Sequence, residues 1–137
     1  MEFRITNDPS PQDIEKIHNQ LRKYNRSRRE PSEAVPIGVF YEDTNGEMTA
    51  GLTGELFGNW LCIRFLWVSE ERRRQGIGSQ LLHAAEAEAR SRGAKYAFVD
   101  TFDFQAPLFY TKHGYHEVFR LSDYPYTGSR YYYTKAL

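Results

Sequence analysis

Apolar residues recur every three or four positions in three stretches of this 137-residue chain, and this spacing predicts amphipathic helices. Ser10-Pro11 opens the first stretch as an N-cap and a first helical residue do. Gly93 follows the second stretch, where a glycine favours the end of a helix. On that second helix, Glu86 and Glu88 precede arginines by four residues, which predicts ion pairs on the outer face. The expected helices cover residues 10–24, 76–92 and 107–113.

Alternating or continuous apolar runs, bounded by turn residues, predict strands in the segments between these helices. Asn45-Gly46 lies between two such runs and is the strongest hairpin signal in the chain. The run Phe65-Leu66-Trp67-Val68 is apolar on both faces, which is typical of a central strand that is covered on both sides. The strands before and after the second helix form a βαβ unit and are expected to be parallel. The expected strands cover residues 2–6, 37–42, 48–57, 60–68, 96–101, 115–121 and 130–135.

The order of these elements predicts an α/β fold: a mixed sheet of six to seven strands with helices on both faces. The length predicts one domain over residues 1–137, with a core that needs no disulfide, and the lone Cys62 can form none within the chain. Lys plus Arg and Asp plus Glu number 18 each, a balance that argues against a nucleic-acid partner. No segment is apolar enough for a signal peptide or a membrane span, so we expect a cytoplasmic protein without a membrane partner.

A glycine-rich segment between the strand that ends at Val68 and the second helix carries the strongest chemical signal. Arg73, Gly76 and Gly78 form an Arg-x-x-Gly-x-Gly pattern there. Backbone N–H groups at a helix start lack partners, the helix dipole favours negative charge, and glycines let a diphosphate approach closely. The alternative is a plain glycine-rich turn beside a solvated run of arginines. A dinucleotide site would need a third glycine where the chain has Leu81, and the P-loop spacing is absent.

Two blocks of the sequence resemble motifs of the GNAT superfamily of acetyl-CoA-dependent N-acetyltransferases. The resemblance implies a GNAT-like fold, splayed between the strands 60–68 and 96–101, with acetyl-CoA as cosubstrate. The superfamily often has Asn where this chain has Asp103, so Asp103 either contacts the pantetheine arm or only caps the third helix. The first block comprises Val68, Arg73, Gln75-Gly76-Ile77-Gly78 and Leu81-Leu82, and the second comprises Ala106, Phe109-Tyr110 and Gly114-Tyr115.

The resemblance also implies roles for individual residues. The acceptor amine would attack the thioester directly, and a backbone N–H near Val68 would stabilise the oxyanion. Tyr110 would protonate the leaving thiolate as a general acid, although beside Phe109 on a short helix it could equally be a core residue. Nothing calls for a metal, because the four histidines are scattered. The pantetheine arm would pair with Leu66, Trp67 and Val68, and the pyrophosphate would lie on the amides of Arg73, Arg74, Gln75, Gly76, Ile77, Gly78 and Ser79.

The general base and the acceptor stay open at this stage. Glu55 and Asp100 lie on expected strands and could act as bases through water, or they could simply face solvent; His18 and His113 are typical of helix surfaces. We expect a small-molecule amine as acceptor and a possible homodimer, since an aromatic C-terminal strand at a sheet edge invites pairing. The alternative function is an acyl-CoA-binding sensor or scaffold that has lost transfer. The C-terminal residues that could wall an acceptor pocket, or pack on the sheet or at a dimer interface, are Asp123, Tyr124, Tyr126, Tyr131, Tyr132 and Tyr133.

Overall fold

The computed structural model describes residues 2–28, 30 and 32–137. The chain forms two compact units, Met1–Ser32 and Glu33–Leu137. The single domain expected over residues 1–137 stays a prediction. No helix in the described part of the chain is both long and apolar enough to cross a membrane.

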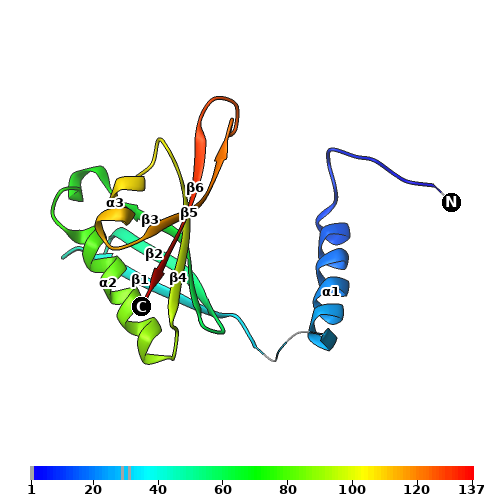
Figure 1. The fold of residues 1–137 in the computed structure, drawn as a ribbon, viewed down its shortest axis with the longest axis horizontal. Helices are drawn as coiled ribbons and strands as arrows, with labels where there is room; N and C mark the ends of the chain where they lie inside the picture. The colour runs from blue at the N-terminus through cyan, green and yellow to red at the C-terminus, as the bar shows by residue number, and fades with distance from the viewer. Residues whose placement is uncertain (1, 29, 31) are drawn as a thin grey trace. The chain divides into compact units, whose positions relative to one another are not determined.

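The first unit contains one helix, α1 (Pro11–Arg28), shown in blue in Figure 1. The N-cap prediction is confirmed, because the backbone N–H of Asp13 donates to Ser10 Oγ at 3.1 Å. The helix continues four residues beyond the expected end; Arg26 and Arg28 in its last turn favour this, since cations stabilise a helix C-terminus. Residues 2–6 form no strand, so the strand expected there is wrong; the described residues of the first unit contain no second strand with which their alternating pattern could pair.

The second unit is a six-stranded mixed sheet with strand order β1-β2-β3-β4-β6-β5 (Figure 1). All neighbouring strands are antiparallel except β3 and β4, which are parallel as the βαβ unit predicts. The expected α/β fold with a mixed sheet is therefore confirmed, whereas helices on both faces of the sheet stay a prediction. Its elements are β1 (Val35–Glu42), β2 (Met48–Phe57), β3 (Trp60–Val68), the 3₁₀ turn η1 (Glu70–Arg72), α2 (Ile77–Ser91), β4 (Tyr96–Phe102), α3 (Pro107–Lys112), β5 (His116–Ser122) and β6 (Ser129–Ala136).

The core lies between the sheet and α2. The apolar stripe of α2, which includes Leu82 and Ala85, is buried against inward-facing residues of β2 and β3 such as Leu52 and Leu61. The opposite face of β3 is different, because Phe65 there is 75% exposed. The apolar run predicts that both faces of β3 are covered, but only the face toward α2 is covered.

A β-bulge sets the direction of the side chains in β3. β2 and β3 change register at Gly54, and Arg64 is the extra residue. Only glycine fits at this position, because a Cβ on Gly54 would collide with the carbonyl oxygen of Cys62. Beyond the bulge Leu66 packs against the core, so the neighbouring Trp67 points to the opposite face of the sheet.

The parallel pairing between β3 and β4 is short. It runs from Trp60 opposite Tyr96 to Cys62 opposite Phe98 and then stops. β3 stays paired with β2 as far as Val68, and β4 stays paired with β6 along its whole length. The two central strands therefore separate, which leaves residues 63–68 of β3 with one free edge.

Candidate active site

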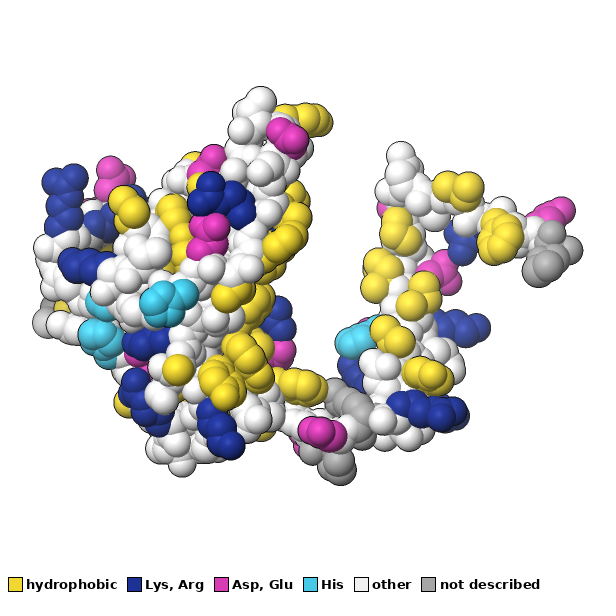
Figure 2. All heavy atoms as spheres, viewed as in Figure 1, with side chains coloured by type: hydrophobic (Ala, Val, Ile, Leu, Met, Phe, Trp, Pro, Cys, Tyr) yellow, Lys and Arg dark blue, Asp and Glu magenta, His cyan; other side chains and the backbone are white. Residues whose placement is uncertain are grey.

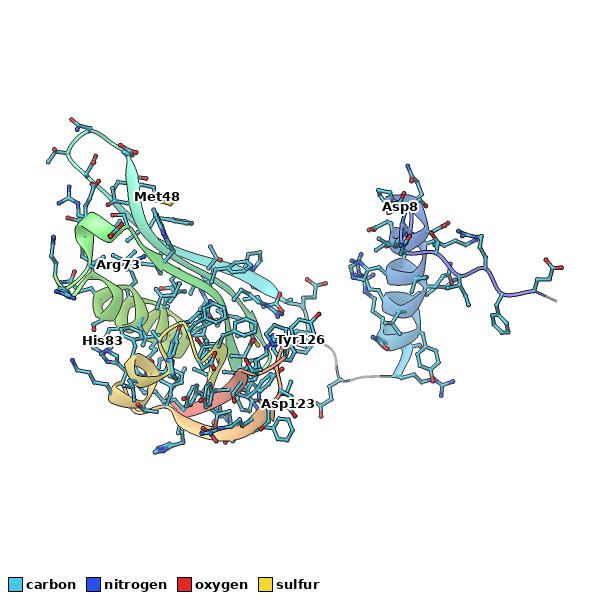
Figure 3. The ribbon with its side chains drawn as sticks, turned by 90° about the horizontal axis from the view of Figure 1, so that it is seen from above. Asp8, Met48, Arg73, His83, Asp123 and Tyr126 are labelled. Atoms are coloured by element: carbon cyan, nitrogen blue, oxygen red, sulfur yellow. The ribbon has the colours of Figure 1, made fainter. Side chains whose placement is uncertain are left out.

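The free edge of β3 leads directly to the glycine-rich loop. Arg73 Nε donates to the carbonyl oxygen of Val68 at 3.1 Å, which ties the loop to the end of the strand (Figure 3 labels Arg73). A Cβ on Gly78 would lie 3.7 Å from the Val68 side chain and 3.6 Å from the ring of Phe109 on α3. The structure thus brings together the two sequence blocks that were predicted to form one site.

The start of α2 has the backbone geometry of an anion site. Arg74 and Gly76 both have positive φ angles, 65° and 78°, so the chain turns sharply before the helix. Gly76 is the N-cap and has no side chain to cap the helix, and the first helical bond is that from Gln80 N–H to the Gly76 carbonyl. The N–H groups of residues 77–79 are therefore left for a ligand. Nothing lies within 4 Å of where a Cβ of Gly76 would be, so the space above the turn is open.

Ser79 connects this loop to α3. Its hydroxyl lies 2.8 Å from Nε2 of His113, whose ring also contacts Phe109 and His83. Burial, with a smaller contribution from the neighbouring His83, lowers the pKa of His113. His113 is partly buried and joins two elements of the site, which corrects its expected place on a helix surface.

Tyr110 is both a core residue and an available proton donor. It is 6% exposed, and its ring contacts those of Tyr115 and Tyr133. Its hydroxyl makes no hydrogen bond within the described part of the chain. Burial, with a smaller contribution from the Asp100 charge, raises the pKa of Tyr110 to about 12. The two alternatives for this residue are therefore compatible, and its phenol is protonated at neutral pH.

Neither strand carboxylate considered as a base is free. Glu55 accepts a hydrogen bond from Arg64 Nη2 at 2.5 Å across the bulge. Asp100 accepts one from Arg130 Nε at 2.7 Å, and Arg130 also donates to the Tyr124 hydroxyl at 3.0 Å. Both carboxylates are thus held in ion pairs instead of facing solvent alone.

A buried network at Glu86 corrects the sequence analysis. The expected pair of Glu86 with Arg90 is present, with 4.0 Å between its atoms, but Glu86 is 1% exposed and does not lie on the outer face of α2. It accepts a hydrogen bond from the Tyr115 hydroxyl at 2.7 Å and bonds from Lys135 Nζ at 2.9 and 3.1 Å. The signal that could have found it is its spacing of four from the core residue Leu82. The outer-face pair of Glu88 with the arginine four residues on is confirmed, with 2.8 Å between its atoms.

Asp103 closes a strand pair and does not cap α3. Its backbone N–H donates to the Ser129 carbonyl at 3.1 Å, and its carboxylate accepts from the Ser129 N–H at 3.3 Å. The N-cap of α3 is Ala106, so the capping prediction is wrong. Gln105 was missed: its Oε1 accepts from the Thr101 hydroxyl at 3.0 Å and from a backbone N–H, which holds the β4–α3 turn.

The C-terminal aromatic residues do not form one wall. Tyr133 is buried, and its ring stacks with those of Tyr110 and Tyr131. Tyr132 alternates with them and contacts Phe98 instead. Asp123 and Tyr126 lie in the β5–β6 turn, labelled in Figure 3, away from the loop at Arg73.

The face of the second unit that Figure 2 shows carries charged side chains of both signs. Within the described residues there is no group of three or more His, Cys, Asp or Glu side chains that could hold a metal ion.

Comparison with known proteins identifies the class. Residues 35–117, more than half of the chain, match the family model described as an acetyltransferase (GNAT) domain. The chain therefore belongs to the GNAT family of acetyltransferases, which confirms the resemblance of its two motifs.

Individual relatives are consistent with this class. Blasticidin-S acetyltransferase of Streptomyces morookaense is 41% identical over 103 residues, which are 72% of this chain and 76% of that protein. The crystal structure of an acetyltransferase from Bacillus cereus superposes with a TM-score of 0.87 at 34% identity, covering 98% of both chains. A streptothricin acetyltransferase from Bacillus anthracis, in complex with acetyl coenzyme A, has a TM-score of 0.67 at 17% identity over 83% of this chain and 68% of that one. The last likeness concerns the fold alone.

Proposed function

We propose that this GNAT acetyltransferase moves an acetyl group from acetyl-CoA to a primary amine of a small acceptor. The observation that carries the proposal is the continuity between the free edge of β3 and the open N-terminus of α2. An extended arm that pairs with residues 66–68 would reach the free N–H groups at residues 77–79 without a break, and the bond from Arg73 to Val68 holds the two parts together. The B. anthracis neighbour, which holds acetyl coenzyme A in the same fold, supports this choice of cosubstrate.

The residues of the chain fit the chemistry of a direct transfer. The amine nitrogen would attack the thioester carbonyl carbon and lose one proton to water, the C–N bond would form, and the C–S bond would break. The strand edge near Val68 would donate a backbone N–H to the oxyanion. Tyr110 would give its proton to the departing sulfur, since its raised pKa keeps it protonated. Holding both reactants at one place would supply the proximity effect.

A small acceptor is supported by the relative that carries the name blasticidin-S acetyltransferase. The balanced surface charge supports a small molecule in preference to nucleic acid. We keep the cytoplasmic location and the homodimer as predictions.

A turnover assay tests the proposal. Purified full-length protein is mixed with acetyl-CoA and a panel of primary amines, and the release of free CoA thiol is followed. We expect release with at least one amine and N-acetylated product by mass spectrometry. Binding of acetyl-CoA without release on any amine would instead favour the acyl-CoA-binding sensor or scaffold.

A further inference from the structure

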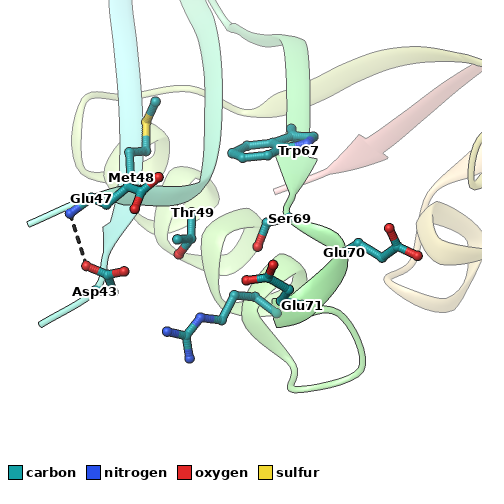
Figure 4. Close-up of a pocket in the computed structure, with 9 residues that line it drawn as sticks. Asp43, Glu47, Met48, Thr49, Trp67, Ser69, Glu70 and Glu71 are labelled. Carbon is teal, nitrogen blue, oxygen red and sulfur yellow. Dashed lines mark hydrogen bonds between the residues drawn. The ribbon is translucent and has the colours of Figure 1, made fainter. Parts of the chain in front are cut away.

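A cavity of about 350 Å³ lies between the β1–β2 turn and η1 (Figure 4). This volume is within the range of small-molecule sites. It contains neither Tyr110 nor any residue of the loop 73–79. Its lining residues are Asp43, Glu47, Met48, Thr49, Trp67, Ser69, Glu70, Glu71 and Arg72.

The cavity is strongly acidic. Four carboxylates and one arginine line it, which gives a formal charge of about −3. Asp43 is held in place because its Oδ1 accepts the N–H groups of Asn45 at 2.8 Å and Glu47 at 3.0 Å. The carboxylates of Glu47, Glu70 and Glu71 have no ion-pair partner in the described part of the chain. Such a site repels the phosphates of CoA and attracts an organic cation.

Two buried hydroxyls give independent support for a ligand. Thr49 Oγ1 and Ser69 Oγ are each less than 1 Å² exposed and have no hydrogen-bond partner among the described residues. Figure 4 shows both directed toward the space between Asp43 and Glu71. Enclosed hydroxyls without partners are uncommon, because they forgo hydrogen bonds to water. A ligand with several N–H donors would satisfy the carboxylates, and rotation of either hydroxyl into the cavity would let that hydroxyl join them.

Trp67 connects the cavity with the proposed site of transfer. Its indole is 49% exposed and forms one wall of the cavity, where it can contact a cation through its ring face. The next residue of β3, Val68, lies about 3.3 Å further along the strand than Trp67, at the end of the free edge. Trp67 points to the face of the sheet opposite α2, so a molecule that contacts its indole lies on that face.

We infer that this cavity binds the cationic part of the acceptor, a guanidinium or a second ammonium group remote from the amine that is acetylated. This inference rests on the proposed function, since it assigns a charge class to the same acceptor. The acceptor is then a dication with hydrogen-bond donors, and an amine with a neutral or anionic tail is a poor substrate.

Two amines of similar length test the inference: agmatine, which carries a guanidinium group, and 5-aminopentanamide, which carries a neutral amide. With saturating acetyl-CoA, the wild-type KM is expected to be at least about tenfold lower for agmatine, with kcat similar for both. The double variant Glu70→Gln/Glu71→Gln removes two exposed charges without changing side-chain size. It should raise the KM of agmatine by about tenfold and leave that of the amide unchanged. Glu88→Gln on α2, a matched charge change outside the cavity, should alter neither value.

Calorimetry in the presence of CoA separates this inference from the proposed function. Agmatine that binds the wild type, and binds the double variant at least about fivefold more weakly, supports the cation site even if no amine is acetylated. CoA that fails to bind the wild type overturns the proposed function alone. Equal KM values for the two amines, an equal rise for both in the double variant, or no binding of agmatine to the wild type overturns the cation site.

Discussion

Tyr110→Phe separates the chemical role of Tyr110 from its role in packing. The change removes one oxygen and keeps a ring that is 6% exposed and packed against Tyr115 and Tyr133. Because the hydroxyl bonds to no group in the described chain, its loss breaks no protein hydrogen bond. The free energy of unfolding should therefore change by less than about 1 kcal/mol. Because the same hydroxyl is proposed to protonate the leaving sulfur, however, its removal should lower kcat by about 10²-fold.

The pKa of Tyr110 adds a second test of the same role. Burial raises it to about 12, so the acid stays protonated well above neutral pH. The wild-type rate should accordingly rise with pH as the acceptor amine loses its proton, and it should not fall through loss of this acid below about pH 11. In Tyr110→Phe the rate should be lower at every pH, and its pH profile should show no additional decrease at alkaline pH.

Single-turnover thiol release, combined with thermal unfolding and CoA binding by calorimetry, measures these effects. Tyr96→Phe, which removes a hydroxyl from a partly exposed ring next to Trp60, is the matched control and should leave kcat unchanged. A Tyr110→Phe variant with near wild-type kcat, when chemistry limits the rate, would refute the reasoning. The thiolate would then leave unaided or with a proton from another donor.

Further perturbations test other parts of the molecule. Gly76→Asp should weaken CoA binding at least about tenfold relative to Gly76→Asn, because both residue types tolerate a positive φ and only Asp adds a negative charge; equal affinities by calorimetry would exclude a diphosphate at this turn. Glu86→Ala should lower the free energy of unfolding by about 3 kcal/mol in urea, since it leaves Lys135 and the Tyr115 hydroxyl without their partner; a loss below about 1 kcal/mol would contradict this. Burial raises the pKa values of Tyr110 and Tyr115 above 10, so their contribution to stability is complete below pH 10 and is lost as pH rises from 10 toward 12; urea unfolding at pH 8 and 11 should show the decrease. The expected homodimer should sediment as a single dimeric species at high concentration, and a monomer there would rule it out.

Local signals in the sequence were enough to locate most elements. The hairpin signal at Asn45-Gly46 precedes β2, and the bounds expected for β2 and β3 agree with the structure to the residue. Residues 2–6 alternate as a strand does, yet a strand exists only where another strand pairs with it. The residue pattern of a segment limits which secondary-structure element it can form, and tertiary contacts determine whether that element forms.

Some parts of the candidate site could likewise be located from local signals in the sequence, and others could not. The position of the loop at residues 73–79 follows from glycine spacing and from the family resemblance. The burial of Glu86 follows from its spacing of four from Leu82, but its partners Tyr115 and Lys135 could not be found locally, because they lie 29 and 49 residues away. The acidic cavity was missed for the same reason: Asp43 and Glu71 come from different turns that only the β1–β2–β3 meander brings together.

The short pairing of β3 with β4 has a consequence for the exchange of backbone hydrogens. β3 is the third of six strands, a position where both edges of a strand normally protect their amides. Past Cys62, the edge of β3 that faces β4 is unpaired, so amides on that edge should exchange as rapidly as those of an outermost strand. An extended molecule that joins this edge would slow their exchange while the amides paired with β2 change little. Hydrogen exchange at residues 63–68 would therefore report the occupancy of the site without a label and without turnover.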